Sequence, residues 1–140
     1  IEPEANDQAI TYATGTERIL VVDDEEVLTE MTSEMLTRLG YRVTTRVSAI
    51  EAIKVFAHDP DRFDLVITDQ TMPQKTGSEL AADLLKIRPG VPIILCTGFS
   101  STINEESAHS VGIQAFLKKP ILKGTLAKTV RDVLDHPMES

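Results

Sequence analysis

The sequence predicts an α/β fold in which a parallel sheet of five strands, in the order 2-1-3-4-5, is covered by helices on both faces. Short apolar runs rich in β-branched residues recur along the chain without alternation of apolar and polar positions, which is typical of strands buried on both faces. Amphipathic stretches with helical spacing separate these runs. Such alternation favours right-handed crossovers within one sheet, and the doubly wound order suits the number of strands.

Length, charge and cysteine content restrict the class of protein. The 140 residues are enough for one domain, and 41% apolar residues are enough to fill its core. A net charge of −8, from 22 acidic and 14 basic residues, disfavours binding to nucleic acid or to an anionic membrane, because both attract positive surfaces. The single cysteine, Cys96, excludes an internal disulfide framework and zinc sites built on cysteine pairs. No apolar stretch is long enough to span a membrane and the polar start is unlike a signal peptide, so we expect a cytoplasmic protein.

The chain divides into one domain and two short flanks. Residues 1–17 are polar and have no helix or strand period, so we interpret them as a linker or arm. A single domain is expected over 18–136, and 137–140 form a tail. Within the domain, strands are expected at 18–22, 43–45, 65–68, 92–97 and 115–117.

Helices are expected between these strands. The first has apolar positions from Val27 to Leu39 at helical spacing and stops at Gly40. Ser48 and Glu51 match a capping box at the start of the second. The other three are expected at 80–87, at 101–111, where the apolar face is weakest, and at 122–134.

Polar side chains follow four of the predicted strands. Asp23 and Asp24 follow the first strand, Asp69 the third, Thr97 stands at the end of the fourth, and Lys119 follows the fifth. Because ligands of such sheets bind beyond the carboxyl ends of the strands, these side chains are expected to meet in one crevice. Taken singly, each residue fits a turn, a helix cap or a solvated charge. Their joint position favours a functional site.

The chemistry of this set indicates a divalent cation and phosphoryl transfer. Three clustered carboxylates repel one another, and Mg²⁺ (or Mn²⁺) relieves this repulsion with the oxygen ligands that it prefers. A carboxylate beside a metal ion can attack phosphorus to give an aspartyl phosphate, while the metal and a lysine neutralise the charge of the phosphoryl group.

Four motifs carry a resemblance to a known family. The segments ILVVDDE at 19–25, DLVITDQTMP at 64–73, ILCTG at 94–98 and FLKKP at 116–120 resemble the receiver domain of two-component response regulators. The resemblance extends from Arg18 to Asp135 and implies a flavodoxin-like (βα)5 three-layer sandwich.

The resemblance implies a phosphoacceptor and a metal site. Asp69 is expected to accept a phosphoryl group from a histidine. Asp24 is expected to bind the metal directly, Asp23 directly or through water, and Thr71 through its backbone carbonyl.

The resemblance also implies a switch next to that site. The hydroxyl of Thr97 and the ammonium group of Lys119 are expected to bind the phosphoryl oxygens, and the Lys119–Pro120 bond is expected to be cis. Phe116 stands at the family's switch position, where tyrosine is frequent, and the surface of the fourth helix, fifth strand and last helix is expected to change.

Two positions are expected to tune the lifetime of the aspartyl phosphate. Thr71 and Phe99 should flank the path of water to the phosphoryl group. Because Phe99 is bulky, slow self-dephosphorylation is expected.

The function implied is that of a phosphoacceptor in two-component or phosphorelay signalling, with self-phosphotransfer and self-dephosphorylation as its only chemistry. The expected partner is the phosphotransfer domain of a histidine kinase or a histidine phosphotransfer protein. The start at Ile1 and the end soon after the last helix favour the C-terminal receiver of a hybrid sensor histidine kinase, which could be tethered to a membrane, over a free-standing single-domain regulator.

Two other classes compete with this interpretation. Haloacid-dehalogenase-like phosphatases also use an aspartyl nucleophile and Mg²⁺, but their acidic motif follows the first strand and has a second acid where this chain has Thr71. A pseudo-receiver that serves only as a docking module is disfavoured, because the acidic pair, Asp69, Thr97 and Lys119 are all present.

Overall fold

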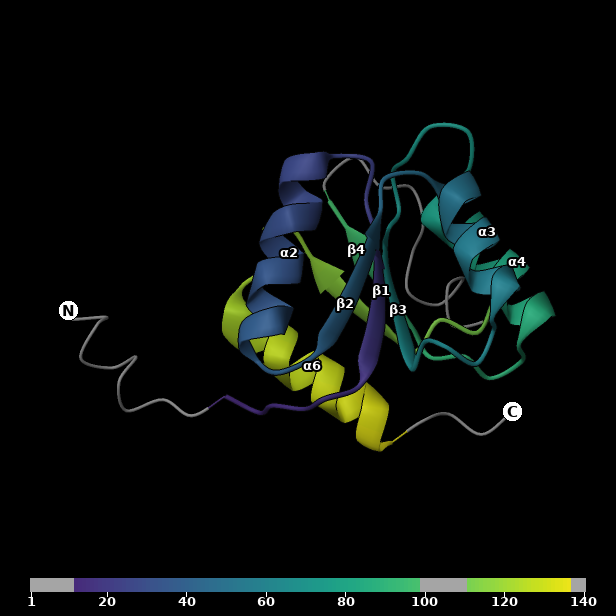
Figure 1. Cartoon of the computed structure of the whole chain (residues 1–140). Coiled ribbons are helices and arrows are strands. Elements are labelled where there is room, and N and C mark those ends of the chain that lie inside the picture. The colour runs from purple at the N-terminus through teal and green to yellow at the C-terminus, as the bar shows by residue number, and fades with distance from the viewer. Residues whose placement is uncertain (1–11, 99–110, 137–140) are drawn as a thin grey trace.

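A computed structural model describes residues 12–98 and 111–136 of the chain, and within them one parallel sheet has the order β2-β1-β3-β4-β5 (Figure 1). The predicted fold class and strand order are therefore confirmed. The strands are β1 (Arg18–Val22), β2 (Arg42–Arg46), β3 (Leu65–Asp69), β4 (Ile93–Thr97) and β5 (Ala115–Lys118).

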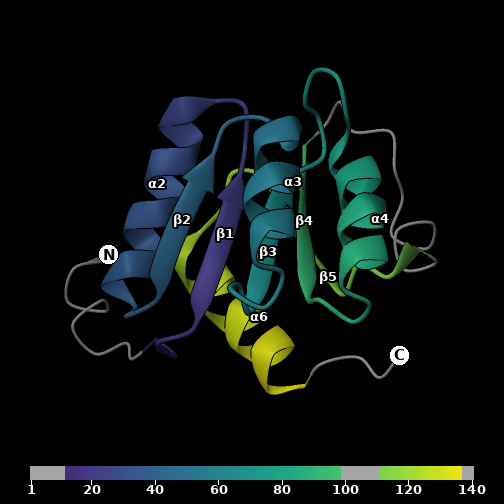
Figure 2. The same ribbon diagram turned by 45° about the vertical axis from the view of Figure 1, so that its right-hand side comes forward.

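The helices cover both faces of this sheet (Figure 2). One face is covered by α2 (Glu26–Arg38) and α6 (Lys123–Asp135), and the other by α3 (Ala49–His58) and α4 (Gly77–Ile87). The helix predicted at 101–111 lies, apart from its last residue, outside the described residues. None of the described helices has the length and apolar character needed to cross a membrane.

The central strands are apolar throughout because they have a core on each side. In β1, Leu20 packs in the core under α3 and α4, whereas its neighbour Ile19 packs in the core under α2 and α6. Successive side chains of a strand point to opposite faces, so a strand covered on both faces buries every residue. All of β3 is buried in this way, down to Asp69 at its carboxyl end.

The helix starts differ in part from the prediction. Ser48 accepts a hydrogen bond from the backbone amide of Glu51, as predicted. The reciprocal bond of a capping box, from the Ser48 amide to the Glu51 side chain, is not formed between these two described residues. The complete capping box lies at α4, where Thr76 and Glu79 each accept a bond from the other's backbone. Gly40 follows α2 with a φ of 104°, a conformation that glycine adopts without strain.

The buried face of α2 is not the one that hydrophobicity alone suggests. Val27 and Met31 follow the apolar spacing but are 68% and 53% exposed. Thr29 and Thr32 are buried in their place, beside Leu36. The hydroxyl of Thr29 donates to a backbone carbonyl at 2.8 Å, which allows this polar side chain to be buried. Two apolar side chains of α2 therefore face solvent.

Part of the predicted arm is bound to the domain. The backbone amide of Gly15 donates to the carbonyl of Leu39, at the end of α2, at 3.1 Å. Tyr12 packs against the core under α2 and α6, and Glu17 forms an ion pair with Arg131 of α6 at 2.7 Å. Residues 12–17 are therefore attached to the folded unit, and residues 1–11 lie outside the described part of the chain.

Candidate functional site

The carboxylates of Asp23, Asp24 and Asp69 meet at the carboxyl ends of β1 and β3. One oxygen of each lies within 4.8 Å of an oxygen of the other two. β1 and β3 are hydrogen-bonded neighbours, which brings their ends together. Two of them, Asp24 and Asp69, border an open crevice of about 360 Å³, which is also lined by Glu25, Thr71, Gly98 and Lys119.

The backbone around Asp69 is fixed on both sides. Asp69 is in register with Cys96 of β4, and the amide of Gln70 donates to the Cys96 carbonyl at 2.9 Å. The amide of Gly77, the first residue of α4, donates to the Gln70 carbonyl at 3.0 Å. A Cβ at Gly77 would collide with the carbonyl oxygen of Asp69, so glycine allows α4 to start against the end of β3.

Asp23 is held by bonds to its backbone and its side chain. Its amide donates to the carbonyl of Arg46 at 3.2 Å, which continues the pairing of β1 with β2. Its Oδ1 accepts from the amide of Glu25 at 3.0 Å, and its carbonyl accepts from the hydroxyl of Thr29 at 2.8 Å. The second oxygen, Oδ2, faces Lys119. Asp24, by contrast, is exposed.

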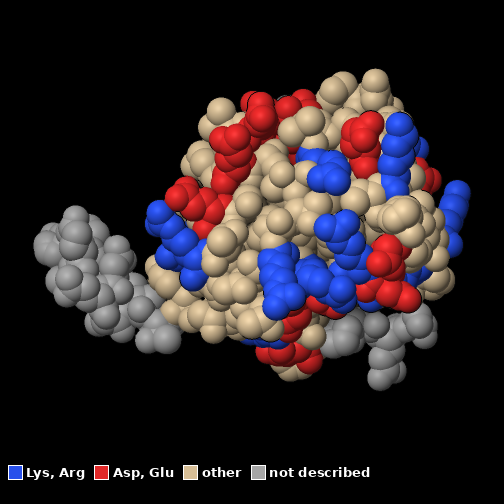
Figure 3. Space-filling view, in the orientation of Figure 1, with Lys and Arg blue, Asp and Glu red and all other residues tan. Residues whose placement is uncertain are grey.

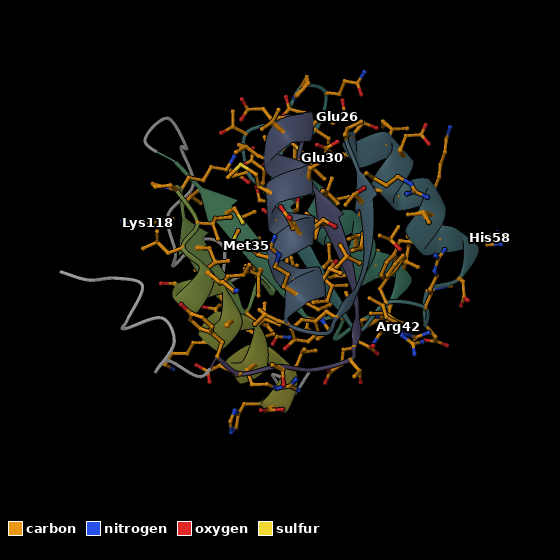
Figure 4. The ribbon with its side chains drawn as sticks, turned by 60° about the vertical axis from the view of Figure 1, so that its left-hand side comes forward. Glu26, Glu30, Met35, Arg42, His58 and Lys118 are labelled. Carbon is orange, nitrogen blue, oxygen red and sulfur yellow. The ribbon has the colours of Figure 1, made fainter. Side chains whose placement is uncertain are left out.

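Lys119 reaches into the cluster from the end of β5. Its Nζ lies 2.8 Å from Oδ1 of Asp69 and 3.2 Å from Oδ2 of Asp23. Its backbone amide donates to the carbonyl of Thr97 at 2.8 Å, and its peptide bond to Pro120 is cis. The neighbouring Lys118 is exposed (Figure 4). Of the two adjacent lysines, Lys119 is therefore the one that contacts the carboxylates.

Burial and charge perturb the groups of this site. Burial raises the pKa of Asp69, and the charges of Asp23 and Asp24 raise it further, while the bond from Lys119 acts in the opposite direction. Burial alone would lower the pKa of Lys119, but its bond to Asp69 and the nearby negative charges outweigh burial and raise it. Burial also raises the pKa of the Cys96 thiol to about 12. Lys119 is therefore a cation, and Cys96 is an unreactive thiol.

The donor set fits a hard divalent cation. Three carboxylates with oxygens this close carry more negative charge than one ammonium group balances. Mg²⁺ prefers oxygen ligands and retains several water molecules, which suits an open crevice with three carboxylates. Asp23, Asp24 and Asp69 are the residues that would hold it. Thr71 borders the same crevice, as expected for a backbone ligand.

The other predicted residues lie around this cluster. Thr97 ends β4 and lines a small hollow beside the crevice, together with Gly98 and Lys119. Phe116 is half-buried in β5 and packs against the core under α3 and α4. Phe99 lies outside the described residues.

An apolar groove adjoins the crevice and was not predicted from the sequence. It has a volume of about 450 Å³ and is lined from α2 by Leu28, Met31, Thr32 and Met35, and from the other side by Asp23, Gly98, Lys119, Pro120 and Ile121. Gly98 and Lys119 border both hollows. The sequence feature that could have predicted this groove is the apolar face of α2, which is wider than the sheet can cover.

Acidic side chains lie along the outer side of α2. Glu26, Glu30 and Glu34 are exposed and recur every fourth residue, so they form a row on one side of the helix. Figure 3 shows acidic side chains gathered over α2, and Figure 4 shows Glu26, Glu30 and Met35 on this helix. The groove itself is therefore apolar, and the acidic row lies on α2 away from the residues that line it.

Comparisons with known proteins agree on one family. Residues 19–131 match the family model "Response regulator receiver domain". The transcriptional regulatory protein GlrR of Escherichia coli K12 is 34% identical over 118 residues, which are 84% of this chain and 26% of the relative. This chain thus spans about a quarter of that relative.

Solved structures give the same result. A response regulator receiver domain protein from Clostridium thermocellum is 28% identical with a TM-score of 0.81, covering 85% of this chain and 94% of that one. The receiver domain of the sensor histidine kinase PA1611 from Pseudomonas aeruginosa PAO1, solved with a magnesium ion in its active-site cleft, is 25% identical with a TM-score of 0.76, covering 86% and 99%.

Proposed function

Because the chain belongs to the response regulator receiver domain family, we propose that it accepts a phosphoryl group on Asp69 in two-component or phosphorelay signalling. One observation carries the proposal: Asp69 is buried at the end of a central strand with two further carboxylates and one ammonium group within reach. A pair of oppositely charged residues would suffice for a structural ion pair. Three carboxylates around one lysine are suited to a metal ion and a phosphoryl group.

The transfer proceeds from a phosphohistidine to Asp69. A carboxylate oxygen of Asp69 attacks phosphorus, the P–N bond to the histidine breaks, and its electron pair returns to the imidazole. Asp23, Asp24 and Asp69, with the Thr71 carbonyl, would hold Mg²⁺ (or Mn²⁺), which would supply neutralisation of the charge on the phosphoryl oxygens. Lys119 already contacts Asp69 and is placed to bind one of these oxygens.

Four residues act after the transfer in this proposal. The hydroxyl of Thr97 turns to the phosphoryl group, and Phe116 moves with it, which changes the surface around β5 and α6. From the family's motif we expect Thr71 and Phe99 to control the approach of water, and the bulk of Phe99 to make self-dephosphorylation slow. The backbone carbonyl of Thr97 accepts a hydrogen bond from the backbone amide of Lys119. The backbone therefore connects the two residues that bind the phosphoryl group in this proposal.

The apolar groove suggests how the donor binds. A histidine must come within bonding distance of Asp69, and the groove opens beside Asp23 and Lys119. We infer that an amphipathic helix of a histidine kinase phosphotransfer domain, or of a histidine phosphotransfer protein, lays its apolar side chains against Met31 and Met35. Amphipathic helices bind apolar grooves in this way.

Charge favours one class of donor helix. Glu26, Glu30 and Glu34 are exposed on the outer side of α2, so a donor that extends beyond the groove over this helix should carry lysine or arginine there. Such pairs at the rim of an interface mainly speed association and select partners.

The chain acts as a signalling phosphoacceptor in this proposal, with no turnover of an external substrate. A receiver domain from a sensor histidine kinase and one from a transcriptional regulator are both similar to it. We favour a receiver attached to a hybrid sensor histidine kinase, facing the cytoplasm, over a free-standing regulator.

The deciding experiment is incubation with acetyl phosphate and Mg²⁺, followed by intact mass spectrometry. The expected result is one phosphoryl adduct that hydroxylamine removes and that is absent from Asp69→Asn. Asp59→Asn, a change at an exposed aspartate at the end of α3, is the matched control and should label normally. An adduct that persists in Asp69→Asn, or no adduct in the wild type, contradicts the proposal.

A further inference from the structure

The segment before β1 is bound along the flank of α6. At one end, the ring of Tyr12 lies 5.3 Å from the ammonium group of Lys123, in the first turn of α6. At the other end, Arg131 donates to both carboxylate oxygens of Glu17 at 3.1 and 2.7 Å. We call residues 12–17 the strap. It spans about two turns of α6 and precedes residue 19, where the match to the family model begins.

Two glycines allow the strap to contact the end of α2. The Gly15 amide donates to the carbonyl of Leu39 at 3.1 Å, and a Cβ at Gly15 would collide with Arg131 and with the ring of Tyr41. A Cβ at Gly40 would collide with the Gly15 carbonyl. An added side chain at Gly15 or at Gly40 would therefore disturb this contact, which indicates that the strap and the end of α2 are shaped to pack together.

Almost all N–H donors of the Arg131 guanidinium group form hydrogen bonds around this contact. Besides Glu17, it donates to the carbonyl of Thr14 at 3.1 Å, to Tyr41 at 3.3 Å and to Asp135 at 2.8 and 3.1 Å. Its side chain is only 21% exposed. The bond from Arg131 lowers the pKa of Glu17, so the pair remains ionised at neutral pH.

The strap is linked to the phosphoryl site through a short connection. Lys119 binds Asp69 and Asp23, and four residues later Lys123 contacts Tyr12. A phosphoryl group on Asp69 would add oxygen atoms beside the Lys119 ammonium group, which must then exchange its partners. The connection from Lys119 to Lys123 is only four residues long, so we expect a change in the partners of Lys119 to affect the first turn of α6.

We propose that the strap couples the segment preceding the domain to the phosphoryl site. The strap binds α6 most tightly while Lys119 is bonded to unmodified Asp69. Phosphorylation of Asp69 therefore weakens the binding of the strap to α6. By linkage, loosening the strap favours the phosphorylated arrangement to the same extent. The phosphorylation half of this inference rests on the proposed function, whereas the link between Lys119 and the strap does not.

The first experiment tests that link without phosphoryl transfer. Hydrogen exchange of the Gly15 amide is measured in the wild type, in Lys119→Gln and in the matched control Lys118→Gln. The amide of Ala52 in α3, which donates to Ser48, serves as the internal reference for global destabilisation. Exchange at Gly15, relative to Ala52, should be at least about threefold faster in Lys119→Gln and unchanged in Lys118→Gln. Equal relative exchange in all three proteins overturns the inference.

The second experiment tests the reciprocal effect. Tyr12→Ala and Arg131→Gln are compared with Lys128→Gln, which removes an exposed ion pair of α6 with Asp132. At limiting acetyl phosphate with Mg²⁺, the ratio of phosphorylated to free protein should rise about fivefold in the strap variants and stay constant in the control.

Circular dichroism identifies folded variants, and Tyr12→Ala suffices if Arg131→Gln does not fold. A ratio that is unchanged or lower in folded strap variants overturns the inference. If the wild type forms no adduct, the proposed phosphoacceptor function fails, and the exchange experiment alone decides the coupling.

Discussion

Lys119 Nζ lies 2.8 Å from Oδ1 of Asp69, across the gap between the ends of β5 and β3. β4 lies between these two strands, so the contact spans two strand spacings. The same ammonium group also contacts Asp23 at the end of β1. One lysine therefore contacts the carboxylates of both Asp69 and Asp23.

Replacing Lys119 by methionine should slow labelling by acetyl phosphate about 100-fold, the scale of removing one donor to a developing charge. The bond from Lys119 opposes the raised pKa of Asp69, so its loss should raise that pKa further. Labelling requires the carboxylate and rises with pH through the pKa of Asp69, so this rise should move to higher pH. Labelling rates over a pH series measure both effects. Lys118→Met should match the wild type, and an unshifted profile in Lys119→Met would contradict the assignment.

Asp69→Asn should stabilise the metal-free protein at pH 7. The folded-state pKa of Asp69 lies above its unfolded value, so its carboxylate opposes folding at pH values above the folded-state pKa. The expected gain is an increase in the free energy of unfolding. It should shrink as the pH falls through the folded-state pKa, because the wild-type carboxyl then becomes neutral too. Thermal unfolding in EDTA at several pH values measures this difference.

Mg²⁺ should stabilise the wild type. An ion bound to the native state stabilises it by about 2.7 kcal/mol at a free concentration 100 times Kd. Asp24→Asn removes an exposed ligand without disturbing the core, so it should lose this gain. Tm is measured against Mg²⁺ concentration for the wild type, Asp24→Asn and the control Asp59→Asn. A Tm that rises equally in all three would exclude the acidic cluster as the metal site.

Met31→Glu should impair labelling by a phosphorylated histidine kinase and leave labelling by acetyl phosphate unchanged. Met31 is 53% exposed in the groove, so folding should tolerate the change, while an added charge opposes the docking of apolar side chains there. The kinase used is the histidine kinase, among those of the same organism, that labels the wild type fastest. With this kinase, the labelling rate of Met31→Glu should be lower by about tenfold or more. Ile50→Glu, at a 41% exposed position on α3, is the matched control. Equal kinase labelling of the two variants would place the docking surface elsewhere.

Gly77→Ala should disturb the site as well as the stability. An added Cβ would collide with the Asp69 carbonyl, so the end of β3 or the start of α4 must shift, at a cost of about 1 to 3 kcal/mol. A displacement of the nucleophile should slow labelling by acetyl phosphate about tenfold or more. Val130→Ala is the control, because it destabilises the core under α2 and α6 away from the site. It should unfold more easily than the wild type yet label at the normal rate.

The fold and the acidic cluster were predictable because they follow from local patterns. Strands covered on both faces must be apolar throughout, and β1 and β3 have that composition. Once the strand order is known, Asp23, Asp24 and Asp69 must lie at one edge of the sheet. The choice of Lys119 over Lys118 came from the family's motif, and the structure agrees with it because only Lys119 contacts the carboxylates.

The remaining features depend on contacts that composition does not encode. The apolar spacing of α2 does not reveal that Thr29 is buried by a hydrogen bond while Met31 is left exposed. The strap has the composition of a linker, and its attachment depends on Gly15 and on Arg131, 116 residues later in the sequence. Such distant pairings are set by tertiary packing, which a local pattern cannot specify.

Because of its position, the reactivity of Cys96 measures how often the centre of the sheet opens. It is the chain's one cysteine, lies in β4 beside Asp69, is 3% exposed, and has a pKa raised to about 12. Alkylating reagents require an accessible thiolate, so they react only with molecules in which the centre of the sheet has separated. The alkylation rate therefore reports how often the phosphoryl site is dismantled, and bound metal or a phosphoryl group should slow it.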